Sequence, residues 1–341
     1  MMSPGTVDDA DNPFVPMLID SLADRVEVLP FSWSGAFRFR YEVLHIHWPE
    51  RMTKDANALR AMLKSATFVA LLSWNRLRKV SNVATVHNLN PHDGTGAFER
   101  WVLALWTKSC RARIFLSRTG MDAAPTGNGV LIPHGDYAPF LAKVGWMKET
   151  SRRDALLTFG YLRPYKGIEK LMNLISHEGS LRLTVAGKPL SPTYREKLED
   201  LAREASGTVE LIPRSLSSEE LLRAIGLSEF VILPYTSVYN SGAALLALSA
   251  GRPLIVTESP SMRELQCEVG NEWVVTLPEA WDWTHVLSAV RALRADASKR
   301  GELPDMHLRN WVGLGAQHAI LYESLDFRRN AVGANGGNSD D

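Results

Sequence analysis

The sequence predicts an α/β protein made of two doubly wound domains, each built on a mostly parallel sheet. The main observation is a repeating unit: a short apolar, β-branched run, a loop, and an amphipathic stretch of about a dozen residues. This unit recurs in two blocks, which are separated by the polar, aperiodic segment 148–154. The length of 341 residues also suits two domains, because domains usually contain roughly 100–200 residues.

The first block opens on a helix. The amphipathic run Phe14–Leu22 precedes any strand of ordinary length, so either the first strand is absent from this chain or the chain starts inside it. The strands expected next are Val43–His47, Val83–Val86, Arg113–Leu116 and Val130–Ile132. The helices expected among them are Asn57–Leu72, Ala97–Ser109 and Ser117–Ala124.

The second block contains six short apolar runs. The strands expected there are Leu156–Phe159, Leu181–Val185, Thr208–Ile212, Phe230–Leu233, Leu254–Thr257 and Trp273–Thr276. A last amphipathic stretch covers Asp305–Phe327, and the residues from 330 to 341 are rich in Gly, Asn and Asp. We therefore expect domains over 1–147 and 148–304, a terminal helix over 305–327 and a disordered tail over 330–341.

Composition excludes several classes of protein. The 38 Lys and Arg residues balance 38 Asp and Glu residues, which argues against a dedicated nucleic-acid binder. No apolar run reaches the ~18–20 residues that span a bilayer, and the N-terminus is acidic rather than basic and then apolar, so we expect a cytoplasmic protein. The two cysteines lie far apart, which argues against a disulfide framework or a cysteine zinc site.

The strongest local motif follows the strand Leu156–Phe159. The chain reaches Gly160, where the backbone can turn tightly, and the loop then presents Arg163 and Lys166 before the next helix. Two cations on such a loop suit a diphosphate, because Coulomb attraction and free backbone N–H groups act on the same anion. The alternative is an ordinary solvated loop with two exposed cations.

A second motif follows the strand Phe230–Leu233. Ser241 and Gly242 precede the helical run Ala243–Ala250, where the helix dipole and the first free amides favour an anion. A plain helix cap without a ligand would show the same residues.

Together, in this order and at this spacing, these segments resemble the C-terminal domain of GT-B glycosyltransferases, in particular glycosyltransferase family 4 and its relatives in bacterial exopolysaccharide assembly. The matching segments are 159–167 (FGYLRPYKG), 185–188 (VAGK), 233–235 (LPY) and 241–253 (SGAALLALSAGRP). In the first block, segments 44–50, 85–92 and 132–136 look like those that border the acceptor side of the cleft. The resemblance implies two Rossmann-like domains facing across a cleft, with the terminal helix packing back toward the first domain.

The resemblance also implies a nucleotide-sugar substrate. Arg163 and Lys166 would bind its diphosphate, and the amides of Ser241 and Gly242 would take a phosphate. The other donor-side residues that the match implies are Gly160, Gly187, Lys188, Arg214, Ser215, Tyr235 and Glu264. No Asp-x-Asp motif lies at a strand end, in agreement with the metal-independent chemistry of this fold, so neither a metal nor another cofactor is expected.

One departure from the family concerns its paired glutamates. When Gly251 and Pro253 are aligned, these glutamates fall at Val238 and Leu246, neither of which is acidic. Ribose contact must therefore come from elsewhere, and the retaining outcome typical of the group is open. The expected reaction is transfer of a mannose- or glucose-type hexose to a polysaccharide or lipid-linked acceptor. The alternatives are a catalytically inactive nucleotide- or sugar-binding module and a nucleotide-sugar epimerase.

Polar and aromatic residues gather near the predicted strand ends of the first block, where an open α/β sheet lines its crevice. His87 is the first choice for contacting the transferred sugar or acting as base, with Asp93 and Asp136 as carboxylate alternatives if the reaction inverts. The acceptor-side candidates are His47, Trp48, Asn88, His92 and His134.

The segment 99–113 combines tryptophans with cations. Trp101 and Trp106 lie on a predicted helix that also carries Arg100 and Lys108. Such a helix can lie on an anionic bilayer and bring the enzyme to a lipid-linked acceptor at the inner face of the plasma membrane. The alternative is a core helix with one solvated side.

Overall fold

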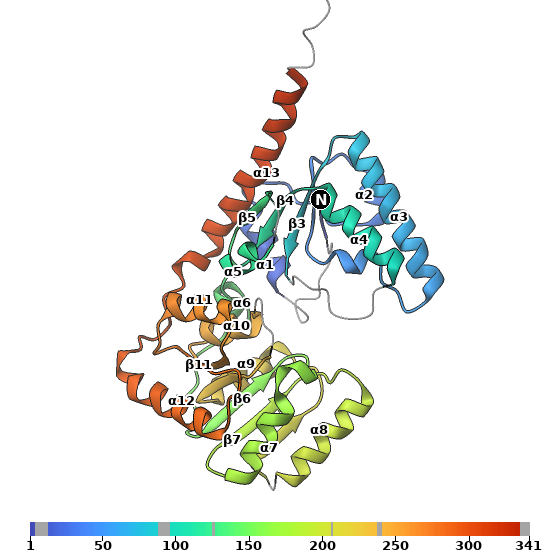
Figure 1. The fold of residues 1–341 in the computed structure, drawn as a ribbon. Helices are drawn as coiled ribbons and strands as arrows, with labels where there is room; N and C mark the ends of the chain where they lie inside the picture. Colours follow the sequence, from blue (N-terminus) through green and yellow to red (C-terminus); the bar gives the residue numbers. More distant parts are fainter. Residues whose placement is uncertain (4–12, 88–95, 125–126, 206, 237–240, 335–341) are drawn as a thin grey trace, which may run out of the picture. The chain divides into compact units, whose positions relative to one another are not determined.

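The computed structural model describes residues 1–3, 13–87, 96–124, 127–205, 207–236 and 241–334 (Figure 1). They form two compact units. Unit 1 comprises Met1–Gly135 and Leu308–Asp341, and unit 2 comprises Asp136–His307. Each unit carries one parallel sheet with helices packed on it, which is the α/β architecture that the repeating sequence unit predicts.

Unit 1 has a five-stranded sheet of order β1-β2-β3-β4-β5. Its strands are β1 (Met2–Ser3), β2 (Val43–Ile46), β3 (Ser81–Val86), β4 (Cys110–Phe115) and β5 (Gly129–Leu131). Its helices are α1 (Phe14–Leu22), α2 (Trp33–Arg38), α3 (Ala58–Leu77), α4 (Ala97–Ser109), α5 (Arg118–Asp122) and α13 (Trp311–Ala334), with 3-10 turns η1 (Pro49–Met52) and η4 (His307–Arg309). Leu44, Phe68 and Trp106 are central to the core between this sheet and its helices.

The short strand β1 pairs with β2 on one side and bridges to Pro30 on the other. A strand of two residues is too short to give a recognisable sequence pattern. Burial of the Met1 and Met2 side chains holds this strand in the sheet. β1 therefore lies between Pro30 and β2, parallel to both.

Unit 2 has a six-stranded sheet of order β11-β10-β9-β6-β7-β8, parallel throughout. Its strands are β6 (Ala155–Phe159), β7 (Arg182–Ala186), β8 (Val209–Ile212), β9 (Phe230–Leu233), β10 (Leu254–Thr257) and β11 (Val274–Leu277). Its helices are α6 (Ala138–Val144), α7 (Ile168–Glu178), α8 (Pro192–Glu204), α9 (Ser218–Leu227), α10 (Gly242–Ser249), α11 (Pro260–Val269) and α12 (Trp283–Ala295), with turns η2 (Pro164–Lys166) and η3 (Asp296–Lys299).

The division between the units falls earlier than the linker expected at 148. Residues 136–147 belong to unit 2, because the backbone N–H of Tyr137 donates to Ser249 Oγ at 2.9 Å and the Trp146 ring packs against Gly226 of α9. These two anchors lie more than 75 residues away in the sequence, which is why local patterns do not show them.

The terminal helix α13 belongs to unit 1, where it packs along α1 (Figure 1). It begins at Trp311 rather than Asp305 and runs through Ala334. The first five residues of the tail that we expected to be disordered, 330–334, are therefore helical, and 335–341 lie outside the described residues.

Candidate active site

The sheet of unit 2 has a topological switch point at β6. The next strand in sequence, β7, lies on one side of β6, while β9 lies on the other. In an open parallel sheet, the helices that follow these two strands cover opposite faces and leave a crevice at the carboxyl ends of the strands. The main ligand site of this sheet is therefore expected beside the residues that follow Phe159 and Leu233.

Two glycines shape this crevice. Gly160 follows β6 with a positive φ of 100°, and Gly187 follows β7 with a φ of 149°. A Cβ at Gly187 would overlap the carbonyl oxygen of Gly160, so the two backbones approach as only glycine permits. The N–H of Leu162 also donates to the carbonyl of Lys188 at 2.9 Å. The loops after β6 and β7 are thus held together where a ligand would meet them.

Lys166 is the central cation of this loop. It lies in η2, is 9% exposed, and places Nζ 4.7 Å from the centre of the Tyr235 ring. Burial and, to a smaller extent, the positive charge of Arg163 together lower its pKa to about 8. The protein thus holds a desolvated ammonium next to a second cation, an arrangement that an anionic ligand stabilises.

Two buried hydroxyls lie at the ends of neighbouring strands. Within the described residues, Tyr235 Oη after β9 and Thr257 Oγ1 at the end of β10 are buried without a hydrogen-bond partner. Buried polar groups are normally satisfied, so such orphans point to a ligand or to water. Tyr235 was expected on the donor side. Thr257 was not expected there, although a threonine at the end of an otherwise apolar strand could have marked it as a candidate.

Helix α10 begins near the same edge. Ser241 Oγ accepts a hydrogen bond from the N–H of Ala244 at 3.1 Å, so this side chain caps the helix. The first amides of a helix lack intrahelical acceptors and carry the positive end of its dipole. Leu246, at the position of one family glutamate, is a buried apolar residue, and Val238, at the other, lies outside the described residues.

The other expected donor-side residues have different surroundings. Arg214 is exposed and forms a bidentate ion pair with Glu220, with distances of 2.7 and 2.9 Å. Its Nη1 also donates to the carbonyl of Ser215 at 3.2 Å. Lys188 is exposed and Glu264 lies half-buried on α11. The Arg214 guanidinium is paired with Glu220, so the backbone groups of this loop and the exposed Ser215 are better placed than Arg214 to contact a base.

Unit 1 places a cluster of aromatic rings around Phe14 of α1. The ring of Phe14 lies 5.5 Å from that of His47, 5.2 Å from His87, 4.6 Å from His134 and 5.5 Å from Trp311. Two of the expected acceptor-side histidines, His47 and His134, therefore meet the catalytic candidate His87 around one ring of this unit. The Phe14 ring that organises them was not singled out from the sequence, because only the fold brings α1 beside the strand ends.

His87 is the half-buried member of this cluster. Trp48 stacks on it with ring centres 4.5 Å apart, and its Nε2 lies 3.4 Å from His47 Nδ1. Burial and, to a smaller extent, the neighbouring His134 together lower the pKa of His87 to about 3. The imidazole is therefore neutral at physiological pH and can exchange hydrogen bonds with a sugar hydroxyl, but it is a weak base in this state.

A second, fully buried network supports the first. His45 lies 2.7 Å from Tyr322 Oη through Nδ1 and 2.8 Å from Thr85 Oγ1 through Nε2. Burial lowers the pKa of His318, which stacks near His45, to about 4. The separation of 277 residues between His45 and Tyr322 explains why sequence inspection missed this network.

Four further expectations concern carboxylates and neighbours of the cluster. Asn88, His92 and Asp93 lie outside the described residues. Asp136 belongs to unit 2, where its Oδ1 accepts from the N–H of Ala138 at 3.0 Å at the start of α6. In the described part of the chain, no three His, Cys, Asp or Glu side chains are grouped as metal ligands would be.

No protein-family profile matches this chain. It is 32% identical over 313 residues to the GDP-mannose:glycolipid 4-beta-D-mannosyltransferase of Xanthomonas campestris pv. campestris, a match that covers 91% of this chain and 88% of that protein.

Solved structures with a similar fold include HepE of Anabaena in complex with UDP, with a TM-score of 0.53, 13% identity, and coverage of 88% of this chain and 80% of that one. Sucrose-phosphate synthase of Thermosynechococcus elongatus gives a TM-score of 0.54 at 15% identity, with coverage of 97% and 80%. The expected fold is confirmed: the chain is a glycosyltransferase of the GT-B fold and belongs to the family of the Xanthomonas GDP-mannose:glycolipid mannosyltransferase.

Proposed function

We propose that this glycosyltransferase moves mannose from GDP-mannose to a glycolipid acceptor. The observation that carries the proposal is the desolvated Lys166 beside Arg163 at the switch point of unit 2. The donor and the acceptor class come from the name of the Xanthomonas relative, which matches this chain over 91% of its length.

On this proposal, the donor diphosphate lies over the Gly160–Lys166 loop. Lys166 and Arg163 offset the charge that develops on the leaving phosphate, and the first amides of α10 take a phosphate oxygen. Tyr235 supports the position of Lys166 through its ring. Because two cations and a helix terminus supply the positive charge, we propose that the reaction needs no metal ion.

The name of the relative specifies a β-linked product. The mannosyl bond of GDP-mannose is α, so the same product here would require inversion. The acceptor O4 hydroxyl loses its proton to a base, its oxygen attacks C1, and the C1–O bond to phosphate breaks with both electrons leaving on GDP. The low pKa of His87 makes it better suited to positioning the sugar than to this proton transfer. We therefore propose Asp93 and Asp136 as the residues to test as the base.

Contact with a membrane would bring unit 1 to a lipid-linked acceptor. No helix in the described ranges is long and apolar enough to cross a bilayer. The surface that supports peripheral contact combines the first two turns of α3 with those of α4, and the two helices contact each other. Its exposed apolar side chains are Leu59, Met62, Leu63, Phe98 and Trp101. Trp106, the other tryptophan of α4, is 1% exposed and belongs to the core.

This apolar surface lies at the functional edge of the unit 1 sheet. Both helices run antiparallel to the strands they connect, so their first turns lie at the carboxyl ends of those strands. The same end carries Trp48 and His87. Arg60 and Lys64 of α3 and Arg100 of α4 add cations at its border, which suits anionic headgroups.

A thermal-shift panel with GDP, UDP, ADP and dTDP tests the donor assignment. Ligands that bind only the folded state raise the midpoint of unfolding by mass action. GDP is expected to give the largest shift, and Arg163→Gln with Lys166→Gln should abolish it, while the exposed control Arg203→Gln should retain it. A larger shift with UDP than with GDP would reject the GDP-mannose assignment.

A further inference from the structure

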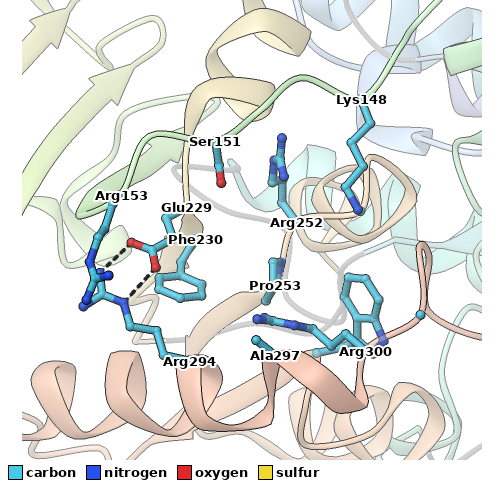
Figure 2. Close-up of a pocket in the computed structure, with 13 residues that line it drawn as sticks. Lys148, Ser151, Arg153, Glu229, Phe230, Arg252, Pro253, Arg294, Ala297 and Arg300 are labelled. Atoms are coloured by element: carbon cyan, nitrogen blue, oxygen red, sulfur yellow. Dashed lines mark hydrogen bonds and ion pairs between the residues drawn. The ribbon is translucent and has the colours of Figure 1, made fainter.

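A second cationic feature of unit 2 lies outside the donor site. It is a cavity of about 500 Å³ whose lining includes Lys148, Arg153, Arg252, Arg294 and Arg300. Glu229 is the one carboxylate among the described residues that line it. We call these residues the cationic pocket (Figure 2). Its lining comes from the segment before β6, the turn after α10, the start of β9 and the end of α12.

The pocket lies at the opposite edge of the sheet from the donor loop. Phe230 begins β9, and the residues Glu229, Pro253 and Trp273 immediately precede β9, β10 and β11. The donor residues follow the carboxyl ends of the same strands, and a four-residue strand is roughly 13 Å long. The pocket is therefore a separate site rather than an extension of the donor site.

One side of the pocket is electrically balanced. Arg294 pairs with Glu229 and Asp154, each at 2.6 Å. Figure 2 shows Arg153 beside this group. Glu229, the single carboxylate among the described lining residues, is thus already paired with Arg294, and the lining carries four further cations.

The other side of the pocket brings three cations together. Lys148, Arg252 and Arg300 surround Pro253 in Figure 2. Arg252 donates to the backbone carbonyls of Ile225 and Gly226, which end α9. Lys148 donates to the carbonyl of Glu302 at 3.0 Å. Neutral carbonyls orient these cations but do not cancel their charge.

Two observations indicate that a bound anion would stabilise these cations. Arg300 Nη1 is buried and has no hydrogen-bond partner within the described residues. Burial and the nearby charge of Arg252 lower the pKa of Lys148, and the Glu302 carboxylate, outside the lining, opposes this shift only in part. Like charges held together and partly desolvated are costly unless an anion is bound between them.

We propose that the cationic pocket is a second anion site, which binds a diphosphate or phosphomonoester group on a small molecule. Guanidinium groups present paired donors that match phosphate oxygens, and Lys148 adds a compact charge. The volume accommodates a phosphate group together with a small organic substituent.

Calorimetric titration with inorganic pyrophosphate tests the proposal in the full chain. The donor site is first disabled with Arg163→Gln and Lys166→Gln, so that any remaining binding comes from another site. We expect one binding event to remain in this background and to weaken at least tenfold when Lys148→Gln and Arg300→Gln are added. Arg300→Lys should restore part of the affinity because it restores the charge.

The matched control is Arg203→Gln with Arg291→Gln, which removes two exposed charges from unit 2 outside the pocket. If the double pocket variant fails to fold, the exposed Lys148→Gln alone should still lower the affinity severalfold. A parallel titration with a hexose 6-phosphate shows whether the pocket takes a diphosphate or a phosphomonoester. No binding in the disabled background, or binding that the pocket substitutions leave unchanged, overturns the proposal without affecting the donor assignment.

Discussion

Lys166 shows how burial sets the chemistry of a single residue. The sequence predicts a cation on the loop after β6, but only the structure places its ammonium over the Tyr235 ring and out of water. The resulting pKa of about 8 makes the charge on Lys166 dependent on pH near neutrality. An exposed lysine would stay charged up to about pH 10.

Diphosphate affinity should therefore fall as the pH rises above 8. The charged form of Lys166 binds the anion, and it is lost as the pH passes through its lowered pKa. Titration of GDP between pH 7 and 9 should show this decline in the wild type. Lys166→Arg should remove most of it, because a guanidinium stays charged. An equal decline in both proteins would show that Lys166 is not the group that titrates.

Gly187 tests the close approach of the two loops. Gly187→Ala should lower the free energy of unfolding by more than about 3 kcal/mol, since the new Cβ adds steric overlap with Gly160 to backbone strain. Gly207 also has a positive φ but open space around it, so Gly207→Ala should cost only about 1 kcal/mol. Chemical denaturation compares the two, and equal losses would contradict the packing.

Helix α4 illustrates what sequence patterns settle at the scale of an element. Its bounds match the predicted Ala97–Ser109. Periodicity alone, however, does not show which of its two tryptophans faces the core. The structure buries Trp106 and leaves Trp101 51% exposed. Which face meets the core depends on α3 and the sheet, so the sequence predicts the helix but not its rotation.

The exposed face of α4 should govern membrane contact. Phe98→Ser with Trp101→Ser should reduce co-sedimentation with anionic vesicles, because these neighbouring rings lie 5.8 Å apart on the surface. Met147→Ser, which changes a residue 81% exposed in unit 2, is the control and should have no effect. Unchanged sedimentation of the double variant would argue against this surface.

The histidine networks at the edge of β2 and β3 should make unit 1 sensitive to acid. Burial lowers the pKa of His134 and His318 to about 4 and that of His87 to about 3, whereas an unfolded histidine titrates near 6.5. The unfolded state thus binds more protons below pH 6.5, and stability falls as the pH drops toward 4. Thermal unfolding at pH 7 and pH 5 should show a lower midpoint at pH 5.

The contribution of a single histidine to this pH dependence of stability can be measured. His318→Leu removes a group that stays unprotonated above about pH 4 in the folded protein, and it should flatten the pH dependence by up to about 1.4 kcal/mol per pH unit. A midpoint that is the same at both pH values in the wild type would contradict the burial of these histidines.

At the scale of the whole molecule, the repeating βα unit is enough to predict two parallel sheets. The donor loop is also visible in the sequence, because Gly160, Arg163 and Lys166 lie within seven consecutive residues. The cationic pocket and the rings around Phe14 are not, since Arg300 and Lys148, or Phe14 and His134, meet only through the fold. Local contacts are readable from sequence, whereas sites assembled from distant segments need the tertiary structure.

The most direct test of the central claim is an assay of mannose transfer from labelled GDP-mannose to a lipid-linked glycan in the presence of a metal chelator. We predict transfer with release of GDP, a β-linked product by one-bond carbon–proton coupling, and loss of activity in Arg163→Gln with Lys166→Gln but not in Arg203→Gln. Binding of GDP-mannose without any transfer would contradict the account and indicate a catalytically inactive nucleotide-sugar-binding protein.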